Sequence, residues 1–159
     1  MAHRAEPEKM PGSRPLAGAG WDFWRAVVGL AYVAAAVFNA VYTLPRSDEL
    51  DDYAEGAWFG FLEDFMWNVF MPNGEVFMTL VIGFEIAVGL LILYRDGFVD
   101  AGVIASVGWV LVVLPFLAWP YLVTNLALAV LQGVLLMRRY ELTIWQRVTM
   151  RASTSGRSG

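Results

Sequence analysis

A run of thirty-seven residues, 101–137, contains no charged side chain and limits the folds that this sequence can adopt. A single α-helix of that length would extend about 55 Å, whereas the hydrocarbon core of a bilayer is roughly 30 Å thick. The run must therefore turn back on itself. Two prolines, Pro115 and Pro120, mark the turn, because proline interrupts a helix. We expect one membrane span near residues 99–116 and another near 120–138.

Two earlier segments also have the length and composition of membrane spans. Residues 26–44 contain no charge, with Arg25 as an anchor at the interface, and residues 76–94 contain only Glu85. Only 16% of the residues in the chain are charged, against about 25% in an ordinary soluble domain. The sequence therefore predicts an all-α membrane protein, a bundle of four transmembrane helices formed by residues 21–145. We expect a disordered cytoplasmic tail at residues 1–20 and a second cytoplasmic tail at 146–159.

The connection between the first two spans, residues 46–75, is strongly acidic. It contains eight Asp and Glu residues and one Arg. Within it, Trp58, Phe61 and Phe65 recur at helical spacing, which predicts an amphipathic helix of roughly 17 residues that ends at a turn over residues 71–74. We expect this helix to lie at the membrane interface, over the open end of the bundle. The alternative is a helix that binds a partner protein through these three aromatic side chains.

The distribution of Lys and Arg predicts the orientation of the chain. Both flanks of the four spans and the turn at Arg95 are basic, while the acidic connection holds one Arg and the turn near residues 115–121 holds none. Positively charged loops stay in the cytoplasm. We therefore expect a multi-pass protein of the plasma (inner) membrane, with both termini in the cytoplasm and the acidic connection outside.

Five polar residues within the expected spans are candidate site residues. Glu85 is the most costly of them, because an ionisable group at the centre of a bilayer costs roughly 2.5–3.5 kcal/mol. Tyr32 and Asn39 lie seven residues apart in the first span, as do Asn125 and Gln132 in the fourth, so each pair shares a helix face. Helix interfaces in membranes favour such groups, and we expect all five in a buried polar pocket. From their depths we expect Glu85, carrying its proton, to pair with Gln132, and Asn39 to pair with Asn125. A structural role and a functional role both remain open for Glu85.

A loose pattern of motifs runs through the spans. It consists of Asn39 late in the first span, the Glu85-x-x-x-Gly89 spacing in a second span that reads FEIAVGLLIL, a short basic turn, and Asn125 early in the fourth span. In this pattern, over roughly residues 24–140, the chain resembles the DoxX/DoxD-like family of small four-helix integral membrane proteins. The resemblance implies a link to thiosulfate–quinone oxidoreduction or to membrane complexes with redox partners.

The chain has no cysteine and no histidine except His3, which removes the usual ligands of haem, iron–sulfur clusters and zinc. We expect no ligated or covalent cofactor and no catalytic residue, and a quinone is the cofactor class that fits. The favoured function is a non-catalytic accessory or anchoring subunit of a larger membrane assembly, such as a respiratory one. The alternatives are a protein that binds a quinone or another lipophile beside an oxidoreductase, and a small transporter or proton pathway that uses Glu85. Expected partners are the bilayer and other membrane subunits or further copies of this chain, and we expect no nucleic acid.

Overall fold

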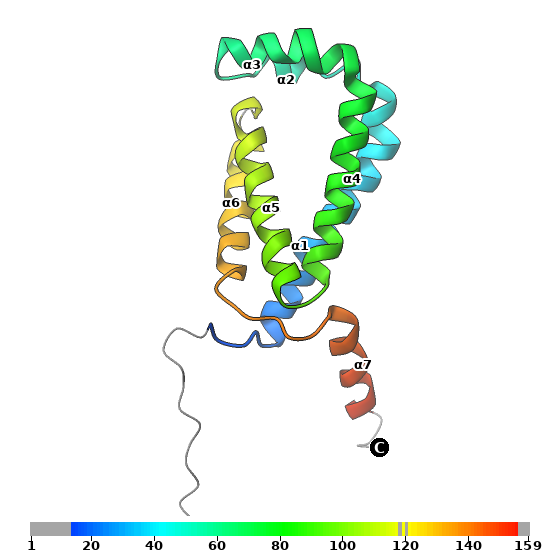
Figure 1. Cartoon of the computed structure of the whole chain (residues 1–159), viewed down its shortest axis with the longest axis vertical. Coiled ribbons are helices and arrows are strands. Elements are labelled where there is room, and N and C mark those ends of the chain that lie inside the picture. The colour runs from blue at the N-terminus through cyan, green and yellow to red at the C-terminus, as the bar shows by residue number, and fades with distance from the viewer. Residues whose placement is uncertain (1–13, 118, 120, 156–159) are drawn as a thin grey trace, which may run out of the picture.

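The computed structural model describes residues 14–117, 119 and 121–155, and all regular secondary structure within them is helical (Figure 1). Three helices are long and apolar enough to cross a membrane: Ala19–Arg46, Gly60–Leu93 and Gly97–Phe116. A shorter apolar helix, α6 (Tyr121–Leu135), follows them. The chain is thus a helical protein with the composition of a membrane protein. The fourth expected span corresponds to α6, whose 15 residues are fewer than expected.

The first and second long helices form one closely packed antiparallel pair. α1 (Ala19–Phe38) continues through a π-helical turn, η1 (Asn39–Thr43), and a 3₁₀ turn, η2 (Leu44–Arg46), and it packs along α4 (Gly74–Leu93). Gly29 and Gly89 face each other across this contact: a Cβ atom on Gly89 would lie 2.9 Å from the Gly29 carbonyl oxygen. Small residues let membrane helices approach this closely. The pair therefore brings polar groups on α1 directly against α4.

The third long helix packs most closely on α4 near one end. α5 (Gly97–Val113), with its 3₁₀ extension η5 (Leu114–Phe116), meets α4 where Gly102 lies against Leu91 and Ile92, and a Cβ atom there would come within 2.9 Å of both side chains. Figure 1 shows α5 and α6 diverging from α1 and α4 away from this contact. The apolar core lies on the closed side, where the buried residues include Val28, Val88, Ile92, Val99 and Val103.

The acidic connection spans the open end of the molecule, between the α1–α4 pair and the α5–α6 side. We call residues 47–73 the roof; they contain α2 (Asp51–Glu55), α3 (Gly60–Phe65), the π-helical η3 (Met66–Phe70) and the 3₁₀ turn η4 (Met71–Asn73), and they lie across the top in Figure 1. The predicted single amphipathic helix is wrong in two respects. It is broken between α2 and α3, and it does not end at residues 71–74, because Gly60–Leu93 forms one continuous, bent helix.

Both differences have local causes. The break contains Gly56, which ends α2 and lies close to the end of α5, and Trp58, whose backbone N–H donates to the Pro115 carbonyl at 2.9 Å. This contact pins the roof to the end of α5. Pro72 lies in the first turn of η4, where a missing N–H costs little, so the helix bends there and continues.

The opposite end carries most of the described arginines, and we call it the arginine-rich end. Residues 14–17 were expected to be disordered, yet they pack against the segment after α6: the Ala17 N–H donates to the Arg139 carbonyl at 2.9 Å. The expected C-terminal tail contains a helix, α7 (Ile144–Ser155). The rest of the two predicted tails, residues 1–13 and 156–159, lies outside the described residues.

Candidate functional site

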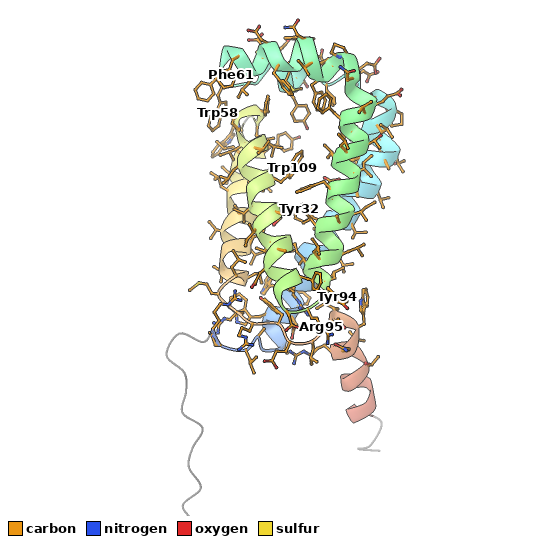
Figure 2. The ribbon with its side chains drawn as sticks, in the orientation of Figure 1. Tyr32, Trp58, Phe61, Tyr94, Arg95 and Trp109 are labelled. Atoms are coloured by element: carbon orange, nitrogen blue, oxygen red, sulfur yellow. The ribbon has the colours of Figure 1, made fainter. Side chains whose placement is uncertain are left out.

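A large apolar pocket lies between α4 and α5, beneath the roof. Its volume is about 670 Å³, within the range of ligand pockets in proteins. Aromatic rings from the roof, α4 and the α5 side form much of its wall: Phe65, Phe70, Phe77, Phe84, Trp109 and Phe116. Figure 2 shows Trp109 in the space between α5 and α4, and the Trp109 and Phe84 rings lie 5.2 Å apart between centroids. The pocket exists because α5 diverges from α4 while the roof holds their ends together.

The wall of this pocket is almost free of polar groups. Among the described residues that line it, none is charged, and the side chains with hydrogen-bonding groups are Asn39, Thr43, Tyr53 and Trp109. Asn39 and Thr43 come from the same side of the pocket, from η1. An uncharged wall disfavours a charged ligand, because burying an unpaired charge is very costly. The pocket therefore suits a neutral, apolar molecule with little polar surface.

Both π-helical turns of the described chain line this pocket. η1 contributes Asn39 and Thr43, and η3 contributes Met66 and Phe70. A π-turn is uncommon, and such turns often occur at functional sites, because they interrupt the regular helix and redirect side chains. Their presence on two separate segments of one pocket marks it as the best candidate site in the molecule.

A chain of hydrogen bonds leads from the pocket wall to Glu85. The Thr43 hydroxyl donates to the Asn39 side-chain oxygen at 2.9 Å, and the Asn39 amide nitrogen donates to the two Glu85 carboxyl oxygens at 3.0 and 2.9 Å. Glu85 is buried, as expected, with 7% of its surface exposed. The expected pairing of Glu85 with Gln132 is wrong. The cause is the direct packing of α1 on α4, which places Asn39 beside Glu85.

Tyr32 and Gln132 form a separate buried pair. The Gln132 amide donates to the Tyr32 hydroxyl at 3.3 Å, and that hydroxyl donates to the Ser106 carbonyl at 3.5 Å. The expected pairing of Asn39 with Asn125 is also wrong, because the Asn125 amide donates to the Tyr121 carbonyl within its own helix. The five predicted polar residues thus form two pairs, Asn39 with Glu85 and Tyr32 with Gln132, and Asn125 belongs to neither. Only Asn39 among them lines the pocket.

The three aromatic residues predicted as a contact surface are divided in the same way. Phe65 lines the pocket. Trp58 and Phe61 do not; they are 50% and 68% exposed and lie together at the end of the roof above α5 (Figure 2). Trp58 lies in the break before α3, so the two residues do not belong to one regular helix.

The arginine-rich end holds a buried ionic cluster that the sequence did not reveal. Arg25, expected at the membrane interface, is completely buried; it donates to the carbonyls of Tyr94 and Leu142 at 3.1 and 3.0 Å. The Asp22 carboxylate lies 3.2 Å from Arg25 and 2.7 Å from Arg147 of α7. This cluster joins α1, α4 and α7 and has the character of a structural clamp.

Tyr140 completes the clamp, with its ring 4.7 Å beneath the Arg25 guanidinium. Its hydroxyl is buried and has no hydrogen-bond partner among the described residues. Burial raises the pKa of the Tyr140 phenol to about 12, and the charge of Arg25 acts in the opposite direction.

The described residues contain no group of three or more His, Cys, Asp or Glu side chains that could hold a metal ion. Comparison of the chain with protein-family models, with curated proteins and with solved structures found no match. The pocket and the groups around it are therefore the features from which we infer a function.

Proposed function

We propose that this protein is a multi-pass membrane protein that holds an uncharged lipophilic molecule in the pocket beneath the roof. The observation that carries the proposal is the pocket itself: about 670 Å³ of space between helices, with aromatic walls and no charged side chain among the described lining residues. In a core packed to the usual density such a space would be filled by side chains. Molecules dissolved in a bilayer are the natural occupants of a pocket with this chemistry.

The proposal includes the position of the chain in the membrane. The helices α1, α4, α5 and α6 cross the bilayer as a four-helix bundle, the arginine-rich end lies in the cytoplasm, and the roof lies outside. The loop charges support this orientation. The molecule then belongs with four-helix proteins of the DoxX/DoxD-like kind in the inner membrane, and a quinone is one neutral lipophile of the required class.

The orientation can be tested with single cysteines, because the chain has none of its own. Glu49 in the roof and Glu141 at the arginine-rich end are both exposed. In intact cells, an impermeant thiol reagent should label Glu49→Cys and leave Glu141→Cys unlabelled until the cells are opened. The reverse pattern would overturn the orientation.

Occupancy of the pocket can be tested by identifying what the protein carries. The protein is purified gently from native membranes, and its bound lipophiles are identified by mass spectrometry. Val81 lines the pocket, so Val81→Trp should fill it and remove the bound molecule. Val76 is on the same helix, 61% exposed and outside the pocket, so Val76→Trp is the matched control and should retain the molecule. If wild-type protein carries no specific lipophile, or if Val81→Trp carries it unchanged, the proposal is wrong.

A second candidate function is a subunit that docks a basic partner protein on the roof. The observation that favours it is the combination of eight carboxylates in residues 46–75 with the exposed side chains of Trp58 and Phe61. Such a field attracts cations, and aromatic anchors supply binding energy at interfaces. A partner held this way should be lost from pull-downs of Phe61→Asp and retained by Phe98→Asp, a change at an exposed phenylalanine on α5. Identical partners for both variants would count against docking at the roof.

A further inference from the structure

We infer that the occupant of the pocket is a neutral lipophile that carries a hydroxyl group, and that this hydroxyl donates a hydrogen bond to Thr43. The inference rests on the proposed function, because it names the chemical class of the molecule that the pocket holds. Its evidence is independent of the size of the pocket. It comes from the direction in which hydrogen bonds are donated in the series that joins the pocket to Glu85.

The three hydrogen bonds that join Thr43, Asn39 and Glu85 are all donated away from the pocket. Thr43 donates to Asn39, and Asn39 donates to both oxygens of Glu85. Glu85 does not line the pocket, whereas Asn39 and Thr43 do. The Thr43 hydroxyl is therefore the group in this hydrogen-bonded series that meets a ligand.

The Thr43 hydroxyl offers a ligand an acceptor. Among the hydrogen bonds of the described residues, the Thr43 hydroxyl acts only as a donor, and its proton is committed to Asn39. Its oxygen lone pairs remain available to a ligand. The Asn39 amide nitrogen is directed to Glu85, so we place the contact of a ligand on this side of the wall at the Thr43 oxygen. Consecutive donors polarise one another, which makes the Thr43 oxygen a better acceptor than an isolated hydroxyl.

The rest of the wall defines the remainder of the molecule. At Thr43 a ketone, ether or ester oxygen, including that of an oxidised quinone, would face another acceptor, while a hydroxyl, including that of a reduced quinone, satisfies both groups. The donors of Tyr53 and Trp109 lie elsewhere in the wall. A carboxylate or phosphate would lack a countercharge among the described lining residues. An alkylphenol has the matching features: a neutral donor, a planar ring for the aromatic walls and an apolar chain.

The test compares 4-octylphenol with its methyl ether, 4-octylanisole, in which a methyl group replaces the hydroxyl hydrogen. Binding to the purified full chain is followed by tryptophan fluorescence, with Trp109→Phe identifying the signal of the pocket. The ratio of the two affinities is compared between proteins, so that the different partitioning of the probes into micelles cancels. Loss of one neutral hydrogen bond should change this ratio by about fivefold.

Thr43→Val is the informative variant, because valine keeps the shape of threonine and places a methyl group where the hydroxyl stands. Thr43→Val should lower the ratio of phenol affinity to ether affinity by about fivefold, while Thr43→Ser should keep the wild-type ratio. Thr79→Val is the matched control: the Thr79 hydroxyl donates to the Glu75 carbonyl outside the pocket, so the preference should be unchanged.

The outcomes separate the two proposals. Equal preference in wild type and Thr43→Val, with both probes bound, would overturn the hydroxyl assignment and leave lipophile binding intact. Failure of wild type to bind either probe would overturn this assignment, and pocket occupancy would then be decided by the mass spectrometry described above. If Thr43→Val does not fold, an unchanged preference in Thr43→Ala would overturn the assignment instead.

Discussion

Asn39 on the first helix donates hydrogen bonds to both carboxyl oxygens of Glu85 on the second, at 3.0 and 2.9 Å. Glu85 is thereby held inside the protein by a neighbour that also forms part of the pocket wall. The two residues connect the costliest group in the sequence to the candidate site.

Replacing Asn39 should destabilise the protein because it removes the amide nitrogen that donates both of these hydrogen bonds. We expect Asn39→Leu to lower the free energy of unfolding by about 1–3 kcal/mol, the usual cost of leaving a buried polar group without its partner. The matched control is Asn125→Leu, which removes only a bond within α6 and should cost much less. Unfolding in mixed micelles, followed by circular dichroism, measures both. Equal costs would contradict the special position of Asn39.

The contact between α1 and α4 should tolerate no side chain at Gly89. A Cβ atom there would lie 2.8 Å from the Val33 side chain and 2.9 Å from the Gly29 carbonyl oxygen. Gly89→Ala should therefore cost about 1–3 kcal/mol, as overpacking usually does. Gly83→Ala is the control on the same helix: nothing lies within 4 Å of its Cβ position, and the gain in helix propensity should make it neutral or stabilising. A lower melting temperature for both variants alike would argue against this packing.

Part of this architecture could be predicted from the sequence, since it follows from composition. Runs of uncharged residues the length of a bilayer gave the three long helices, and the cost of burying Glu85 predicted that it faces inward. The pairing of Glu85 could not be predicted from depth alone. It depends on which helices are adjacent, and the Gly29–Gly89 contact that decides this is one of several small-residue patterns in the sequence.

The pocket was missed for a related reason. The aromatic residues of the roof have helical spacing, which predicts a regular amphipathic helix but not its break near Gly56 or the π-turn at Met66. These irregularities depend on contacts with distant segments, such as the bond from Trp58 to Pro115. Phe84 and Trp109, which meet across the pocket, had no signal in the sequence beyond their aromatic character.

Arg25 should be far more important for stability than its position near a membrane boundary implies. Arg25→Gln would leave the buried Asp22 with Arg147 alone and would remove the guanidinium from the Tyr94 and Leu142 carbonyls. Breaking a buried ion pair in this way costs about 3–5 kcal/mol. Arg95→Gln is the control, because its ion pair with Asp96 is exposed and should contribute close to nothing. Similar unfolding midpoints for the two variants would refute the clamp.

The Tyr140 phenol should titrate at a pKa of about 12, well above the ordinary tyrosine value of 10.0, because it is buried. The folded protein then keeps a proton that the unfolded chain releases. The resulting stabilisation is fully present below pH 10 and is lost as the pH rises towards 12. The difference in ultraviolet absorbance between wild type and Tyr140→Phe isolates this one residue. A titration midpoint near 10 would show that the phenol is accessible to water.

The binding pocket can be tested by mapping where a membrane-dissolved probe binds to the protein. The full chain in lipid nanodiscs is irradiated with an alkylphenol that carries a diazirine, and the labelled residues are identified by peptide mass spectrometry. We expect labels concentrated on the roof and α5 sides of the pocket, around Phe70 and Trp109, and we expect Val81→Trp, but not Val76→Trp, to lose them. Labels spread over outward-facing residues such as Leu90 and Val130, equally in all three proteins, would contradict the existence of a binding pocket.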